Sequence, residues 1–99
     1  MGRLFAYARV STADQKTENQ RQALAAAGYE PEPFRYFEEQ ISGRVPALER
    51  PEFSRMLQKL EPGDTLVVLK LDRLGRDAKD ILTTVRHLQG LGVRVVLLD

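Results

Sequence analysis

The stretch LFAYARV, residues 4–10, is a short apolar run that is followed at once by the polar residues Ser11 and Thr12. Its length and composition predict a buried β-strand. The run carries a guanidinium at Arg9, and Gln15 follows a few residues later. Polar side chains gathered at the end of a buried strand call for an explanation, functional or structural.

The next residues predict a helix, a strand and a loop. A helix is expected from Thr17, because Thr17 and Gln20 match a capping box and an alanine-rich stretch leads to Gly28, a residue that favours helix ends. Residues 34–38 alternate weakly and predict a second strand. Residues 39–50 contain glycine and proline without a clear period, which predicts a long loop.

The second half of the chain repeats the alternation of helix and strand. Pro51 is expected to open a helix, and residues 65–70 form the clearest strand pattern of the chain. Asp77 is placed to cap a third helix, and residues 93–98 predict the last strand. The apolar faces of the second and third helices consist of Phe53, Met56, Leu57 and Leu60, and of Ile81, Val85 and Leu88. Gly90 or Gly92 is expected to end the third helix.

The resulting order, β-α-β-α-β-α-β, is typical of α/β proteins. It predicts a mainly parallel four-stranded sheet with helices on both faces, a three-layer αβα architecture with right-handed crossovers. In such a sheet the carboxyl ends of the strands meet at one edge, and ligands bind in the crevice there.

The composition limits the class of protein. The chain has 99 residues, of which 42% are hydrophobic and 29% charged, as expected for one modest globular domain. It has no cysteine, which excludes disulfides and thiolate metal sites. No membrane span or secretory signal is recognisable, so a cytoplasmic location is expected. The formal charge of +1 argues against a strongly basic nucleic-acid domain, so an anion site must come from local placement of arginines.

Three segments leave the carboxyl ends of the first three predicted strands, and a parallel sheet would bring them together. They supply a candidate hydroxyl nucleophile, several guanidinium groups and one acid. The residues are Arg9, Ser11, Gln15, Ser42, Arg44, Arg50, Lys70, Asp72, Arg73 and Arg76.

This collection suits chemistry at a phosphodiester. Arginine presents a planar fork of donors that matches phosphate oxygens. Displacement at phosphorus builds negative charge that fixed donors stabilise, and removing one such donor typically slows a reaction by about 10²–10³-fold. A serine that attacks phosphorus forms a phosphoserine ester that keeps the free energy of the bond. A second alcohol can therefore reverse the step without a nucleotide cofactor.

For each of these residues taken alone, a purely structural role is an alternative to a role in catalysis or binding. Ser11 or Thr12 can satisfy backbone amides in a turn before the helix. Arg73 and Arg76 can form a solvated helix start, and Asp72 can be a turn acid or a salt-bridge partner. The loop arginines and the lysine at the strand end can simply be solvated. The convergence of all these residues at strand ends favours the functional interpretation.

Several other chemistries lack their residues. The only histidine, His87, lies within the third predicted helix, which makes a Ser-His-Asp triad improbable. No G-x-x-x-x-G-K-[ST] motif is present, and the carboxylates do not cluster in a metal-ligand pattern. The sequence therefore leads us to expect neither a metal nor a cofactor.

The motifs YARVST at residues 7–12, SG at 42–43 and KLDRLGRD at 70–77 resemble the N-terminal catalytic domain of the serine recombinases, the resolvase/invertase family. The resemblance covers nearly the whole chain in the same order. It implies a sheet of strand order 2-1-3-4. It also implies that Ser11 attacks DNA and holds a 5′-phosphoserine link while the 3′-hydroxyl is freed, with strand exchange and religation following without metal or ATP.

The resemblance also implies roles for the surrounding residues. Arg9, Arg73 and Arg76 would cradle the scissile phosphate, and Asp72 would donate a proton or organise the arginines. Arg50 matches the family's loop arginine better than Arg44 does. The residues implied to bind DNA or to support the site are Gln15, Gln20, Ser42, Arg44 and Lys70.

Family members continue with a long dimerisation helix and a DNA-binding part. Residues 1–99 are accordingly expected to be a catalytic domain truncated before both. DNA binding, the homodimer and the synaptic tetramer would belong to the full-length protein, and the fragment alone is expected to be monomeric and inactive. Two other functions stay open. One is a non-catalytic anion- or nucleotide-binding module of flavodoxin-like build, and the other is an assembly remnant that docks on an intact recombinase.

Overall fold

The computed structural model describes residues 2–12 and 16–98 of the chain. Its centre is a four-stranded sheet of order β2-β1-β3-β4 in which every neighbouring pair is parallel. The strands are β1 (Leu4–Val10), β2 (Tyr36–Gln40), β3 (Thr65–Val68) and β4 (Arg94–Leu97). This arrangement confirms the predicted parallel sheet and its strand order.

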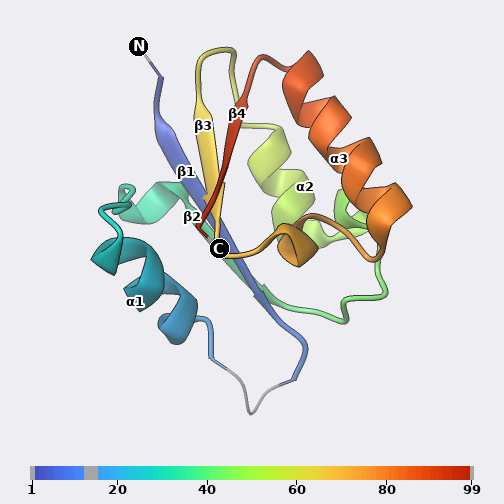
Figure 1. Ribbon diagram of the computed structural model, residues 1–99, viewed down its shortest axis with the longest axis horizontal. Coiled ribbons are helices and arrows are strands. Elements are labelled where there is room, and N and C mark those ends of the chain that lie inside the picture. The colour runs from blue at the N-terminus through green and yellow to red at the C-terminus, as the bar shows by residue number, and fades with distance from the viewer. Residues whose placement is uncertain (1, 13–15, 99) are drawn as a thin grey trace.

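The helices cover both faces of the sheet, as predicted. Helix α1 (Glu18–Ala26) lies on one side, and α2 (Pro51–Leu57) and α3 (Ala78–Gly90) lie together on the other (Figure 1). The core beneath α2 and α3 is the larger one and includes Phe5, Tyr7, Phe37, Phe53, Met56, Leu66 and Leu88. The core beneath α1 consists of the buried residues Ala6, Leu24 and Val67. Alternate residues of β1 and β3 point to opposite faces and supply both cores.

The helix ends follow the sequence signals in most cases. The Asp77 carboxylate accepts a hydrogen bond from the Asp80 amide at 2.8 Å and caps α3 as expected. Gly28 follows α1 with φ +93°, a conformation that glycine adopts without strain. Gly92, also at positive φ, follows α3. His87 is exposed on α3, which agrees with a surface role.

Two local predictions are wrong. Thr17 does not cap α1 with its side chain. Its hydroxyl instead donates to Glu38 on β2, because the neighbouring strand offers a carboxylate that competes with the helix amides. The second strand begins at Tyr36 rather than at residue 34, since Pro33 opens a 3₁₀ turn, Pro33–Arg35, that delays the strand.

The loop between β2 and α2 is shorter than predicted and partly ordered. It contains a 3₁₀ turn at Ala47–Glu49, and a further 3₁₀ turn, Leu71–Leu74, follows β3. The longest helix, α3, has 13 residues. Within the described part of the chain, no helix combines the length and the hydropathy that a membrane crossing demands.

Candidate functional site

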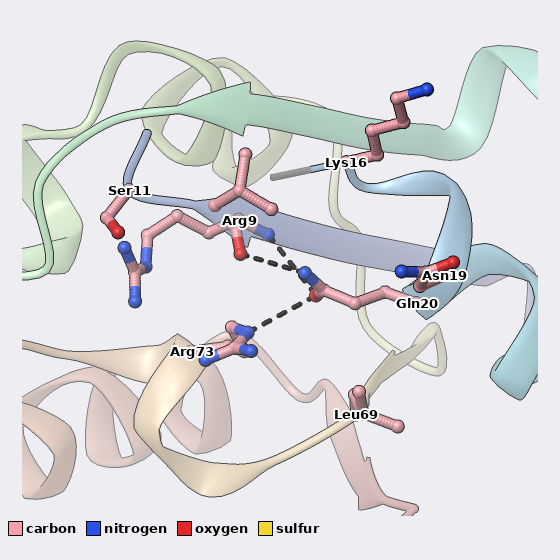
Figure 2. Close-up of a pocket in the computed structure, with 8 residues that line it drawn as sticks. Arg9, Ser11, Lys16, Asn19, Gln20, Leu69 and Arg73 are labelled. Atoms are coloured by element: carbon pink, nitrogen blue, oxygen red, sulfur yellow. Dashed lines mark hydrogen bonds between the residues drawn. The ribbon is translucent and has the colours of Figure 1, made fainter. Parts of the chain in front are cut away.

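A cleft of about 570 Å³ opens at the carboxyl edge of the sheet, between the end of β1 and the end of β3. The chain passes from β1 outward to β2 and later returns to β3 on the other side of β1, so this is the point at which the strand order reverses. Open parallel sheets bind ligands at such a point. The side chains that line the cleft are Arg9, Val10, Ser11, Lys16, Asn19, Gln20, Leu69 and Arg73 (Figure 2).

Ser11 is the first residue after β1 and is exposed. Its hydroxyl is directed toward the guanidinium of Arg9, and Arg73 enters the same cleft from the turn after β3 (Figure 2). The structure thus brings together four of the residues singled out in the sequence: Arg9, Ser11, Gln20 and Arg73.

Gln20 joins the two arginine-bearing segments. Its side chain is only 5% exposed. The amide nitrogen donates to the Arg9 carbonyl at 2.8 Å, and the amide oxygen accepts from Nε of Arg73 at 3.2 Å. Because one planar group bonds to both segments, Gln20 fixes the Arg73 guanidinium against the end of β1 (Figure 2).

Arg9 is held from the side opposite Gln20. Its Nη1 donates to the carbonyl of Ile41 at 2.9 Å. A Cβ at Gly43 would lie 3.3 Å from Nη2 of Arg9, so the absence of a side chain lets the guanidinium pack on the backbone. Burial lowers the pKa of Arg9, and the neighbouring positive charges of Arg50 and Arg73 lower it further. Arginine stays ionised nevertheless, so the cluster presents concentrated positive charge that an anion would relieve.

Arg73 pairs with an acidic neighbour, Asp72. Its Nη1 lies 3.0 Å from Oδ1 of Asp72. The side chain of Asp72 is 66% exposed, whereas that of Arg73 is 18% exposed. A pair with one exposed member contributes little to stability. Asp72 is therefore free to leave Arg73 when an anion arrives.

Arg50 is fully buried behind the cleft and does not line it. Its Nε donates to the Val45 carbonyl at 3.0 Å, and its Nη1 donates to the Arg73 carbonyl at 2.8 Å. Arg50 therefore acts on the cleft through the backbone of Arg73 and through its charge.

Glu39, at the end of β2, is a residue that sequence reasoning missed. Its carboxylate accepts a hydrogen bond of 2.6 Å from the Tyr7 hydroxyl and bonds of 3.2 Å from the amides of Glu52 and Phe53. It thus caps α2 from another segment of the chain. Burial raises the pKa of Tyr7, and the Glu39 acceptor raises it further. This agrees with a packing role for Tyr7, whose ring meets that of Phe53 edge to face.

The remaining predicted residues that the structure describes do not line the cleft. Arg76 is exposed, and its Nε is 3.6 Å from Oδ2 of Asp77. Ser42 accepts a hydrogen bond from the amide of Arg44 in a local turn, and both side chains are exposed. The exposed Lys70 follows β3 and Leu69, and Gln15 lies outside the described residues.

Lys16 and Asn19 line the cleft and were also missed. Lys16 precedes α1, and Asn19 lies in the first turn of α1. As polar residues that follow β1, both could have been expected at the crevice. Among residues 2–12 and 16–98, no three histidine or carboxylate side chains cluster in a way that could hold a metal ion.

Comparison with known proteins places this geometry in a family. Residues 4–99 match the family model "Resolvase, N terminal domain". The Tn2501 transposon resolvase of Escherichia coli is 56% identical over 95 residues, which are 96% of this chain and 49% of the relative. The serine recombinase PinR of Escherichia coli K12 is 52% identical, over 96% of this chain and 48% of the relative. The chain therefore spans about half the length of these curated relatives.

Solved structures agree with the fold. A serine recombinase from Sulfolobus solfataricus superposes with a TM-score of 0.75 at 26% identity, covering 100% of this chain and 69% of that one. The C-terminal catalytic domain of ISC1926 TnpA, an IS607-like serine recombinase, gives a TM-score of 0.75 at 21% identity, over 98% and 67% of the two chains. The chain belongs to the resolvase family of serine recombinases and matches its N-terminal domain.

Proposed function

We propose that residues 1–99 form the catalytic domain of a site-specific DNA recombinase and that Ser11 is its nucleophile. One observation carries the proposal: the exposed Ser11 hydroxyl shares a cleft with Arg9 and Arg73, and Gln20 holds both arginine segments in place. The relatives named resolvase and serine recombinase support the same class of reaction.

In the proposed step, Oγ of Ser11 attacks the scissile phosphorus. The Oγ–P bond forms as the bond between phosphorus and the 3′-oxygen breaks. The serine proton passes to a base, and the departing 3′-oxygen takes up a proton to become a free hydroxyl. The 5′-phosphoserine ester keeps the energy of the broken linkage, so a 3′-hydroxyl from another strand can attack it and release Ser11.

The arginines supply the electrostatic part of the reaction. Arg9 and Arg73 donate to the phosphate oxygens on which negative charge grows, in a cleft where their mutual repulsion already favours an anion. Asp72, now paired with Arg73, would organise that arginine or give the leaving oxygen its proton. Arg50 would hold the Arg73 backbone, and Arg76 would complete the phosphate contacts once DNA is bound.

The remaining predicted residues are proposed to contact DNA. Gln15, Ser42, Arg44 and Lys70 would contact or order the strands that approach the cleft. Because the chain spans about half the length of its curated relatives, we place the homodimer, the synaptic tetramer and most of the DNA affinity in the full-length protein. The formal charge of +1 fits this division, since a firm and salt-sensitive grip on DNA needs many phosphate contacts. The isolated chain would then neither bind DNA firmly nor recombine it, and specific cleavage by these 99 residues would refute that.

A chimaera tests the chemistry directly. Residues 1–99 replace the corresponding half of the Tn2501 resolvase, and the chimaera is incubated with that resolvase's recombination DNA, nicked so that cleaved ends cannot rejoin. A covalent protein–DNA adduct is expected on a denaturing gel, with the phosphate mapped to Ser11. Ser11→Ala should abolish the adduct and Thr12→Ala should keep it. An adduct that persists in Ser11→Ala would assign the nucleophile to another residue.

A further inference from the structure

Two segments hold the arginines of the cleft from behind. The first, residues 41–50, is called here the support loop. The second, residues 70–77, is called the arginine turn. In the support loop, the Ile41 carbonyl accepts a hydrogen bond from Nη1 of Arg9. The arginine turn carries Arg73 itself. The relative placement of these two segments therefore contributes, together with Gln20, to the distance between the two guanidinium groups.

A single carboxylate oxygen on α3 bonds to both segments. Oδ2 of Asp80 accepts the Arg76 amide of the arginine turn at 2.8 Å and the Ala47 amide of the support loop at 3.1 Å. Ala47 is fully buried, so solvent cannot replace the partner of its amide. Asp80 does not line the cleft, and it bonds to the backbone amide of Arg76 rather than to the guanidinium.

Asp80 is itself held rigidly. Its amide donates to the Asp77 cap at 2.8 Å, and its carbonyl accepts the buried Thr84 hydroxyl at 2.9 Å. Gly75 packs so closely that a Cβ there would lie 2.8 Å from Oδ2 of Asp80. The carboxylate therefore has little room to move, and its two acceptor contacts stay aligned.

A second side-chain link joins the two segments, because Nη1 of Arg50 donates to the Arg73 carbonyl at 2.8 Å. Two bonds at separate points fix the orientation of the arginine turn against the support loop more firmly than one bond does. The bond of Arg50 reaches the middle of the arginine turn, at Arg73, and the bond of Asp80 reaches its end, at Arg76.

We infer that Asp80 is a positioning residue that keeps Arg9 and Arg73 at the spacing the cleft needs. The inference rests on the proposed function only in what that spacing serves. Because one oxygen accepts both amides, an asparagine whose carbonyl oxygen takes that place can make the same two bonds without the charge. Asp80→Asn should therefore keep the geometry, and Asp80→Ala should lose it.

The geometric part is measured on the 99-residue chain without any ligand. In the wild type, Nε–H of Arg73 is bonded to Gln20, so its exchange with solvent should be slow in NMR spectra. Asp80→Ala should accelerate that exchange by at least about fivefold, since a displaced donor loses its aligned acceptor. Asp80→Asn should stay within about twofold of the wild type by the same reasoning. Leu88→Val, a core change on the same helix, controls for general loss of stability.

The functional part uses inorganic phosphate as the probe. Phosphate should shift the Nε–H signals of Arg9 and Arg73 in the wild type. The affinity of the chain for phosphate should fall at least about fivefold in Asp80→Ala, because misplaced donors lose their alignment with the anion. Asp80→Asn should keep the affinity of the wild type. The inference is overturned if Arg73 exchange in Asp80→Ala matches that in Leu88→Val, or if Asp80→Asn behaves as Asp80→Ala. If exchange responds as expected but the wild type does not bind phosphate, the proposed function fails and the positioning role stands.

Discussion

Removal of the Asp64 charge should change the acid stability of the chain in a defined pH window. Asp64 precedes β3 and is 2% exposed. Its carboxylate accepts the Arg3 amide at 2.9 Å, Nη2 of Arg3 at 2.8 Å and the Glu61 amide at 2.8 Å. Burial alone would raise the pKa of Asp64, but these donors outweigh burial and lower the pKa to about 2.

The magnitude follows from the two pKa values. A fall from 3.8 to about 2 corresponds to about 2 kcal/mol, at about 1.4 kcal/mol for each unit of pKa. Because the folded pKa lies below the unfolded one, this stabilisation is fully present above the unfolded value of 3.8. It is lost as the pH falls from there toward 2.

The assay is urea unfolding of the wild type and of Asp64→Asn at a series of pH values from neutral to about pH 2. At neutral pH, Asp64→Asn should be less stable by about 2 kcal/mol, and the two curves should converge near the acid end. Glu61→Gln is the matched control, since it removes an exposed carboxylate 3.6 Å from the same arginine and should change stability by less than about 0.5 kcal/mol. A constant difference between wild type and Asp64→Asn across the whole range would refute the assignment.

Three further outcomes are expected. Glu39→Ala should lower the free energy of unfolding by about 2–3 kcal/mol in urea, because the Tyr7 hydroxyl and two helix amides lose a charged acceptor; a change below about 0.5 kcal/mol would contradict the cap. Gln20→Ala in the chimaera should slow adduct formation by about 10²-fold, since Arg73 loses its support, and an unchanged rate would oppose that role. Burial raises the pKa of Tyr36 to about 12, so its neutral form adds stability that is present below the ordinary pKa of 10.0 and is lost as the pH rises toward 12. Alkaline unfolding of Tyr36→Phe should lack this loss, and a slope equal to that of the wild type would count against it.

Much of the fold was predictable because hydrophobic periodicity and helix signals are local. The alternation of strands and helices, the Asp77 cap and the glycine after α1 all depend on residues within a few positions of one another. The prediction for Thr17 failed because its hydroxyl has two partners in reach, and the one that prevails, Glu38, is brought there by the sheet.

The site was predictable only in part, for a related reason. A parallel sheet places the ends of β1 and β3 together, so the meeting of Ser11, Arg9 and Arg73 followed from topology. Long-range polar contacts carry no such signal. Nothing in the pattern around Arg50 indicates that it is fully buried, and nothing local to Glu39 indicates that it caps a helix that begins 12 residues later.

The unequal size of the two cores has a consequence for the local stability of the cleft. The core beneath α1 has Leu24 at its centre with partly buried residues such as Leu4 and Tyr36 around it, whereas α2 and α3 share a broader and more deeply buried aromatic and aliphatic layer. The amide hydrogens of α1 should accordingly exchange with deuterium at a lower opening free energy than those of α3. Asn19 and Gln20 belong to α1, so this wall of the cleft should open locally more often than the side that α3 covers, and equal protection of α1 and α3 would contradict that expectation.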